Sequence, residues 1–469
     1  MYLNFLTFSV CPLRSFYKKL EHPMCLSLIL VDVFWMKRSF SKLRIFIFLD
    51  IRQKHQIFNN SENYSFSCRG LWFWIVSLDI QIFKKINETI LRYPYNNEHL
   101  GLIASGLDEE AKNIDKKITQ CRNSLFALLG PAFSFKCLLS PLVQIHLWRV
   151  YNLPVLLSGL CTLPIRPTHV KPLAIYHNKV LRGFLKVSSS SPVPALHFLF
   201  GELPLEAQLH IGTLTLFHNL WCNPHTTVHA IVRYVLRMCE LSSLTWSNPI
   251  QLLCLKYNLP SPLGLLENST PWSKDKWKCL VKTTITVYHE RKLREMSSLN
   301  SKMKYLNVQL CGLSGCPHPA LMNITTTQDV KKLRHHIKLL TGDLLTADRR
   351  AIDQPGLNPS CPLCSAPRET IEHVLVACKG TAEPRQRIYP ELVNTVAQVQ
   401  PTCEILHTHN DMILTQFILD CTSPNLPDHY RVPSHNPRVS EIFKISRDWS
   451  YAICIMRARL FNQKKAKTT

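Results

Sequence analysis

The sequence lacks the motifs of several enzyme classes. It contains no Asp-Asp pair, so the paired carboxylates of two-metal nucleotidyl transfer are missing. It also lacks the phosphate-binding loop G-x4-G-K-[ST], the nucleophile elbow G-x-S-x-G and the zinc-protease motif H-E-x-x-H. No cluster of acids suggests a nuclease. We therefore expect a chain that is not an enzyme and has no evident small-molecule substrate.

Long apolar runs are also missing. No run reaches 18 residues, and the two strongest, Cys25–Trp35 and Gly70–Ile80, are interrupted by Asp32 and Asp79. We therefore expect no membrane span. The apolar N-terminal segment has no basic region and no cleavage site, so we expect no signal peptide. Apart from one group, the 18 cysteines are scattered singly, which is typical of reduced thiols in an intracellular protein of the nucleus or cytoplasm.

Acidic residues are few. Asp and Glu number 32 against 55 Lys and Arg, which gives a formal net charge of +23. A balance this basic, spread along the chain, favours a polyanionic partner, and the usual one is RNA or DNA.

Glycine is almost absent from the first part of the chain, where Gly70 is the only one before residue 100. Turn signals are correspondingly poor. The segments FIFLDI and LWFWIVSLDI have the composition of strands, but we assign no fold to residues 1–91, which are ill-defined. A genuine domain and fused, unrelated or poorly folded sequence are both open at this point. Beyond them, HLGLIASG predicts a short strand ending in a turn.

Helical patterns dominate after residue 106, so the predicted fold class is mostly α. Asp108 is placed to cap a helix that ends at Gly130-Pro131, and Ser140-Pro141 has the order of an N-cap followed by the first helical residue. Ser273 could cap a long helix. Further helices are predicted at His169–Val187, Leu205–Trp221, Thr227–Cys239, Pro249–Tyr257 and Arg447–Phe461, with loops at Ser188–Pro194 and Pro260–Pro271.

Four residues form the most specific motif. Cys361, Cys364, His373 and Cys378 are spaced C-x2-C-x8-H-x4-C. Three thiolates and an imidazole complete a tetrahedral zinc site and leave no position for a catalytic water, so we expect one structural Zn²⁺. The segment ETIEHVLVAC predicts a short helix. Because the step from His373 to Cys378 is wider than one turn, this helix should end or tighten near Cys378.

A basic helix precedes this motif, beginning near Asp329. It has an apolar side and a basic side, and the candidate nucleic-acid contacts are Lys331, Lys332, Arg334, Lys338, Arg349 and Arg350. His335 and His336 point to different faces, where we expect phosphate contact or solvation rather than a shared metal. A second grouping, Cys311, Cys316 and His318, lacks a fourth ligand nearby, and we interpret it as a structural turn.

The order of these features is similar to a known family. A basic helix, then T-G-x-L, then CPLC, then ETIEH with a closing Cys, resembles the C-terminal region of reverse transcriptases from non-LTR (LINE-type) retrotransposons. This match runs from Asp329 to about Tyr389. In that family the Cys/His module, here Cys361, Cys364, His373 and Cys378, follows the polymerase and is implicated in nucleic-acid binding during target-primed reverse transcription.

The resemblance extends upstream to about residue 92. EHLGLIASGLDEEAKNIDKKI resembles the end of the palm entering the thumb, VYNLPVLLSGL and LRGFLKV resemble thumb helices, and FGELPLEAQLH resembles the connector. It implies a palm end and thumb over 92–200, a helical connector over 201–328, the basic helix and zinc module over 329–395, and a helical tail over 396–469.

The departure from the family is as informative as the match. Fingers and the catalytic palm should precede residue 92, yet residues 1–90 carry no such motif. We therefore expect a truncated element with unrelated sequence upstream and without the polymerase activity. Two alternatives stay open at this point: a zinc-stabilised module for protein–protein interaction, and a decayed relic without a selected function.

Overall fold

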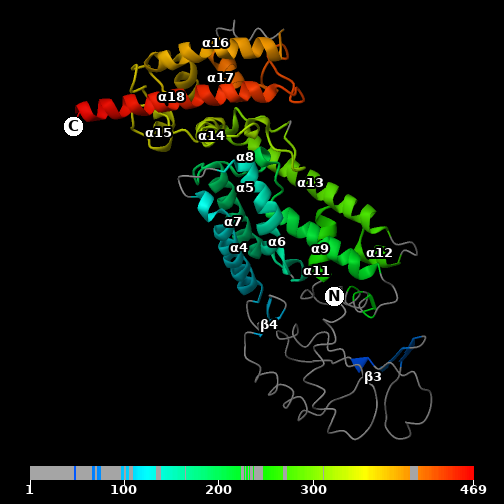
Figure 1. Ribbon diagram of the computed structural model, residues 1–469. Helices are drawn as coiled ribbons and strands as arrows, with labels where there is room; N and C mark the ends of the chain where they lie inside the picture. The colour runs from blue at the N-terminus through cyan, green and yellow to red at the C-terminus, as the bar shows by residue number, and fades with distance from the viewer. Residues whose placement is uncertain are drawn as a thin grey trace, which may run out of the picture. The chain divides into compact units, whose positions relative to one another are not determined.

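The computed structural model describes residues 109–133 and 139–468, with gaps at 164, 223–226, 228, 231, 233–235, 237–246, 268–271, 310 and 402–409; before residue 109 it describes only short strands. The chain divides into two compact units, Met1–Glu109 and Glu110–Thr469. The second unit is helical almost throughout (Figure 1), which confirms the predicted mostly-α fold class. None of the described helices is both long enough and apolar enough to cross a bilayer.

The described strands of the first unit form two small antiparallel sheets. In one, β3 (Leu71–Trp74) lies between β1 (Ile47–Phe48) and β2 (Phe66–Cys68), with Phe66 opposite Phe73. In the other, β4 (Asn97–His99) pairs with β5 (Leu102–Ala104). The strands predicted in FIFLDI, LWFWIVSLDI and HLGLIASG are thus present in part.

The second unit begins with α4 (Glu109–Phe133), which does not end at Gly130-Pro131 as predicted but continues to Phe133. Proline's fixed φ is compatible with a helix, so α4 continues past Pro131 at the cost of one main-chain hydrogen bond. The predicted cap Asp108 lies outside the described residues. Ser140 does cap α5 (Pro141–Leu147), because its hydroxyl accepts the Leu142 N–H at 3.3 Å. The wider turn η2 (Trp148–Asn152), then α6 (Leu153–Leu157) and the 3-10 turn η3 (Leu160–Thr162) follow.

The next helices build the main core of this unit. They are α7 (Pro167–Leu185), α8 (Val193–Phe200), α9 (Leu205–Trp221, as predicted), α11 (Ser247–Lys256), α12 (Pro262–Glu267) and α13 (Lys274–Ser298). Ser273 caps α13 by accepting the Lys276 N–H, as expected. Along α13, Trp277, Val281 and Ile285 are fully buried in one cluster with residues of α9 and α11.

Two loop predictions are wrong in part. Helix α8 begins inside the predicted loop Ser188–Pro194, and α12 lies inside the predicted loop Pro260–Pro271. In α12, the Ser261 hydroxyl accepts the Gly264 N–H at 3.0 Å and Pro262 occupies the first helical position. This is the serine–proline order that marks the start of α5, so the signal was present in the sequence. The predicted helix Thr227–Cys239 lies largely outside the described residues.

The C-terminal helices surround the Cys/His motif. The 3-10 turns η4 (Ser301–Met303) and η5 (Pro319–Leu321) lead to α14 (Thr327–Leu340) and α15 (Ala347–Asp353). After the motif come α16 (Ala382–Val399), α17 (Asp411–Leu419) and α18 (Val439–Thr468). Helix α18 is longer than the predicted Arg447–Phe461, and it packs against both α14 and α16 (Figure 1).

Candidate metal centre

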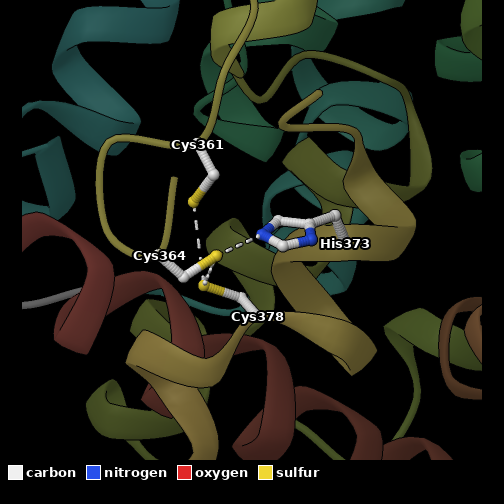
Figure 2. Close-up of side chains that lie close together, drawn as sticks. All are labelled: Cys361, Cys364, His373 and Cys378. Atoms are coloured by element: carbon white, nitrogen blue, oxygen red, sulfur yellow. Dashed lines mark hydrogen bonds between the residues drawn. The ribbon is translucent and has the colours of Figure 1, made fainter. Parts of the chain in front are cut away.

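The four motif residues converge on one point, as Figure 2 shows. The Cys361 and Cys378 sulfurs are 3.8 Å apart, as are those of Cys378 and Cys364, and the Cys364 sulfur lies 3.2 Å from His373 Nε2. All four potential ligand atoms lie within 4.8 Å of one another. Cys361 and Cys378 are buried, while Cys364 and His373 are half-buried. The four residues can therefore hold a metal ion.

The first two cysteines are positioned by a tight turn. The Ser365 N–H donates to the Cys361 carbonyl at 2.9 Å, and the Cys361 N–H donates to the Ala366 carbonyl at 2.8 Å. Ser365 adopts a φ of +62°, which reverses the chain directly after Cys364. Backbone N–H groups of Leu363 and Cys364 donate to the Cys361 sulfur. The turn thus presents both sulfurs to one side and supplies donors that stabilise their ionised form.

The other two ligands are positioned by an unusually wide turn. The short helix begins at Ile371, but η6 (His373–Ala377) is a π-helix, and the Cys378 N–H donates to the His373 carbonyl at 2.7 Å. An α-helix would place residues five apart about 140° from each other. The π-helical turn brings them nearer to one face. The helix ends at Ala377, next to Cys378, as predicted. It widens before that residue, and the tighter 3-10 turn η7 (Lys379–Thr381) follows it.

The electrostatics of the group differ among its members. Burial raises the pKa of the Cys361 thiol to about 12. Burial also opposes ionisation of Cys364, but hydrogen bonds from the Ala366 N–H and from the Cys361 and Cys378 thiols lower its pKa overall. Burial lowers the pKa of His373, which favours the neutral imidazole that binds metals. Three ionised thiols this close would repel one another unless a cation lay between them.

Two of the sulfur–sulfur distances fit a tetrahedral ion. A zinc–sulfur bond of about 2.3 Å places two thiolates of a tetrahedron about 3.8 Å apart. The two sulfur–sulfur contacts in the cluster, at 3.8 Å each, match that spacing. Because all four ligands come from the protein, such an ion would have a closed coordination shell.

The chain around the ligands is fixed by contacts to α18. Trp449 Nε1 donates to the Leu375 carbonyl at 3.1 Å, and Lys464 donates to the Pro362 carbonyl. Arg457 binds both carboxylate oxygens of Glu369 at 2.9 Å, and the Glu369 side chain is fully buried. The ligand segment is therefore packed onto the C-terminal helix.

The six predicted nucleic-acid contacts occupy different environments. Lys331 is exposed, whereas Lys332 pairs with Asp448 at 2.6 Å and Arg349 pairs with Asp353 at 3.0 Å. Arg350 lies over the Phe461 ring at 5.9 Å. Burial lowers the pKa of Arg334, and both Arg334 and Lys338 are half-buried. These residues therefore do not form one exposed basic face.

The neighbouring histidines are also more buried than expected. His336 is fully buried and its Nδ1 lies 3.0 Å from the Ser450 hydroxyl, so the prediction that it contacts phosphate or solvent is wrong. It faces inward because α14 packs its apolar side against α18. His335 is half-buried and packs edge-on against Tyr451.

The grouping of Cys311, Cys316 and His318 has other partners. The Cys311 thiol donates to the Asn307 carbonyl at 3.0 Å, and Cys316 is exposed. His318 Nδ1 accepts the Ala320 N–H, while its Nε2 lies 3.4 Å from buried Asp420. His318 thus stabilises the turn at Ala320 and lies beside the buried carboxylate of Asp420.

A second polar cluster was not predicted. Glu206, His210 and His289 place potential ligand atoms within 4.8 Å of one another. Lys256 donates to the Glu206 carboxylate at 2.6 Å, and the Tyr257 hydroxyl lies 2.6 Å from His210 Nδ1 and 3.0 Å from His289 Nε2. A cation thus already neutralises the carboxylate, and we interpret the cluster as a hydrogen-bonded network. The sequence shows that Glu206 and His210 are four residues apart, but it does not show that α13 brings His289 beside them.

In the comparison with known proteins, no protein-family model and no curated protein matches this chain.

Proposed function

We propose that this chain binds RNA or DNA through the phosphate backbone, with little sequence readout, and that a structural Zn²⁺ holds its C-terminal module together. The observation that carries the proposal is the formal net charge of +23. Lys and Arg side chains attract the phosphate backbone of any sequence, and this attraction supplies most of the affinity in non-specific binding.

Zinc is the ion that best suits the donor set. Three cysteines and one histidine are typical of structural zinc sites. The ion would supply the positive charge that allows Cys361, Cys364 and Cys378 to ionise together, and it would contribute folding free energy to the surrounding segment. With no open coordination position, the proposed role is structural and not catalytic.

We also propose an evolutionary origin for the chain. The order of sequence patches from residue 92 to about residue 395 supports descent from a non-LTR retrotransposon reverse transcriptase. The chain would retain the thumb, connector and Cys/His module without the catalytic aspartates, so we propose no polymerase activity for it.

A salt titration of the full chain tests the binding proposal. We expect a labelled, unstructured single-stranded RNA or DNA to bind with an affinity that falls steeply with salt, by about 300-fold between about 50 and 200 mM if about six phosphates are contacted. An affinity that does not change with salt, or no binding at low salt, would contradict it.

A metal analysis tests the zinc proposal separately. The purified chain should contain one zinc per molecule, and Cys361→Ser with Cys364→Ser should contain none. Both substitutions leave the count of Lys and Arg unchanged. An ordered segment 355–385 in protein free of metal, measured by hydrogen exchange, would count against the structural role.

A further inference from the structure

Helix α13 carries a row of lysines that the sequence motifs did not single out. Lys274, Lys278 and Lys282 follow one another at four-residue steps and are all exposed. We call these three residues the α13 lysine row. At a rise of about 1.5 Å per residue, each step is about 6 Å and the row spans about 12 Å.

These lysines have no carboxylate partner in the described part of the chain. Asp275 is the only acidic residue of α13 before Glu290. Thr283 and Thr286, which follow the row along the helix, are polar but uncharged. Lys332 and Arg349, which the sequence favoured, are each paired with an acid. The α13 lysine row is therefore the more available basic surface.

The adjoining face of α13, about 60° around the helix from the row, holds the row in place. Trp277, Val281 and Ile285 are fully buried, and Trp277 Nε1 donates to the Leu214 carbonyl at 3.0 Å. Helix α13 packs along α9 over this stretch (Figure 1). The backbone positions of the three lysines are therefore fixed before any ligand binds, which lowers the entropic cost of binding.

From this arrangement we infer that the α13 lysine row binds the phosphodiester backbone of a single nucleic-acid strand. The inference rests on the proposed function and names the surface that performs it. A row of equally spaced cations along one side of a helix suits a ligand that repeats one negative charge at a comparable interval. The row carries no donor and acceptor pattern of its own, so it would not read bases.

The test compares two triple variants of the full chain. Lys274→Gln, Lys278→Gln and Lys282→Gln remove the row, and glutamine keeps a similar helix propensity. The matched control is Arg387→Gln, Arg431→Gln and Arg438→Gln. It removes the same charge from two exposed arginines and from half-buried Arg431, which are paired with Glu383, Glu441 and Asp428. Oligouridylate and oligothymidylate are the ligands, and zinc content and circular dichroism confirm that each variant is folded.

We expect the row variant to reduce the slope of log affinity against log salt by about 2, since each phosphate contact on a single strand contributes about 0.7. The control should keep the wild-type slope. Equal losses in both variants would assign binding to diffuse charge and overturn the inference, as would an unchanged row variant. If the wild-type chain binds an acidic peptide but neither oligonucleotide, the proposed function fails with it.

Discussion

Gly380 sits where two parts of the candidate metal centre come close. A Cβ atom at this position would lie 2.8 Å from Leu363 Cβ and 3.7 Å from the Cys378 sulfur. Leu363 belongs to the turn that carries Cys361 and Cys364, so an added methyl group would push that turn away from Cys378. Glycine is required here by close approach and not by backbone conformation.

We therefore predict that Gly380→Ala weakens metal binding about tenfold or more. Substitution of residues that contact and orient metal ligands typically lowers the metal affinity by that much. Competition with a chromophoric chelator measures the change. Gly183→Ala is the control, since nothing lies within 4 Å of a Cβ at this position in the last turn of α7. That substitution should stabilise the helix by about 0.5–1 kcal/mol and leave metal affinity unchanged. Equal metal affinities in both variants would refute the steric account.

At the level of single residues, the sequence predicted the four candidate ligands but not the contacts that hold them in place. The spacing of Cys361, Cys364, His373 and Cys378 is local, and the structure brings all four together. Glu369 and Arg457 are 88 positions apart, and no local pattern connects them. Their pairing depends on how α18 crosses the ligand segment, which is a tertiary outcome.

Among the helices, α18 makes the contacts that support the candidate metal centre. Its residues Trp449, Arg457 and Lys464 contact the ligand segment at Leu375, Glu369 and Pro362. The sequence predicted a helix over Arg447–Phe461 from its amphipathic pattern, and it missed the first and last turns because capping and packing, rather than periodicity, set helix ends. The wide turn at His373–Ala377 was missed for a related reason, since a π-helical insertion leaves no clear periodic signal.

A truncation tests this connection. A chain that ends at Met456 loses Arg457 and Lys464, which leaves Glu369 buried without its cation. Removing one partner of a buried pair costs about 3–5 kcal/mol, so we expect this chain to be destabilised and to release its metal more readily. Urea unfolding followed by chelator competition measures both effects. A chain ending at Lys465 keeps both contacts and should match the wild type; equal behaviour of the two truncations would show that α18 does not support the site.

Across the whole molecule, buried histidines make stability depend on pH. Burial lowers the pKa values of His197 and His289 to about 4 and those of His210 and His336 to about 3. For His336 and His210, nearby cations lower the pKa further. In the unfolded chain each would titrate near 6.5. Between 6.5 and the lowered values, the unfolded chain therefore binds protons that the folded chain does not.

The sign follows from this difference. Stability is fully present above pH 6.5 and falls as the pH drops below it, by about 1.4 kcal/mol per pH unit for each such histidine. At about pH 5 four histidines together would cost about 8 kcal/mol, which is comparable with the 5–15 kcal/mol that stabilises typical domains. We therefore predict unfolding between about pH 6 and 4.5, where most exposed carboxylates still carry their charge. Circular dichroism against pH measures the transition, and a signal that stays constant to about pH 4 would contradict it.

His336→Asn separates the histidine effect from acid release of the metal, because both proteins keep the same Cys/His cluster. Asparagine does not titrate. The variant should be less stable at neutral pH, because it loses the contact that His336 makes to Ser450. Its stability should nevertheless depend less on pH, by about 1.4 kcal/mol per unit between about pH 6 and 5. Urea titrations at several pH values give both slopes. Parallel slopes would mean that His336 is protonated in the folded chain, which its full burial against Phe443 and Ser450 opposes.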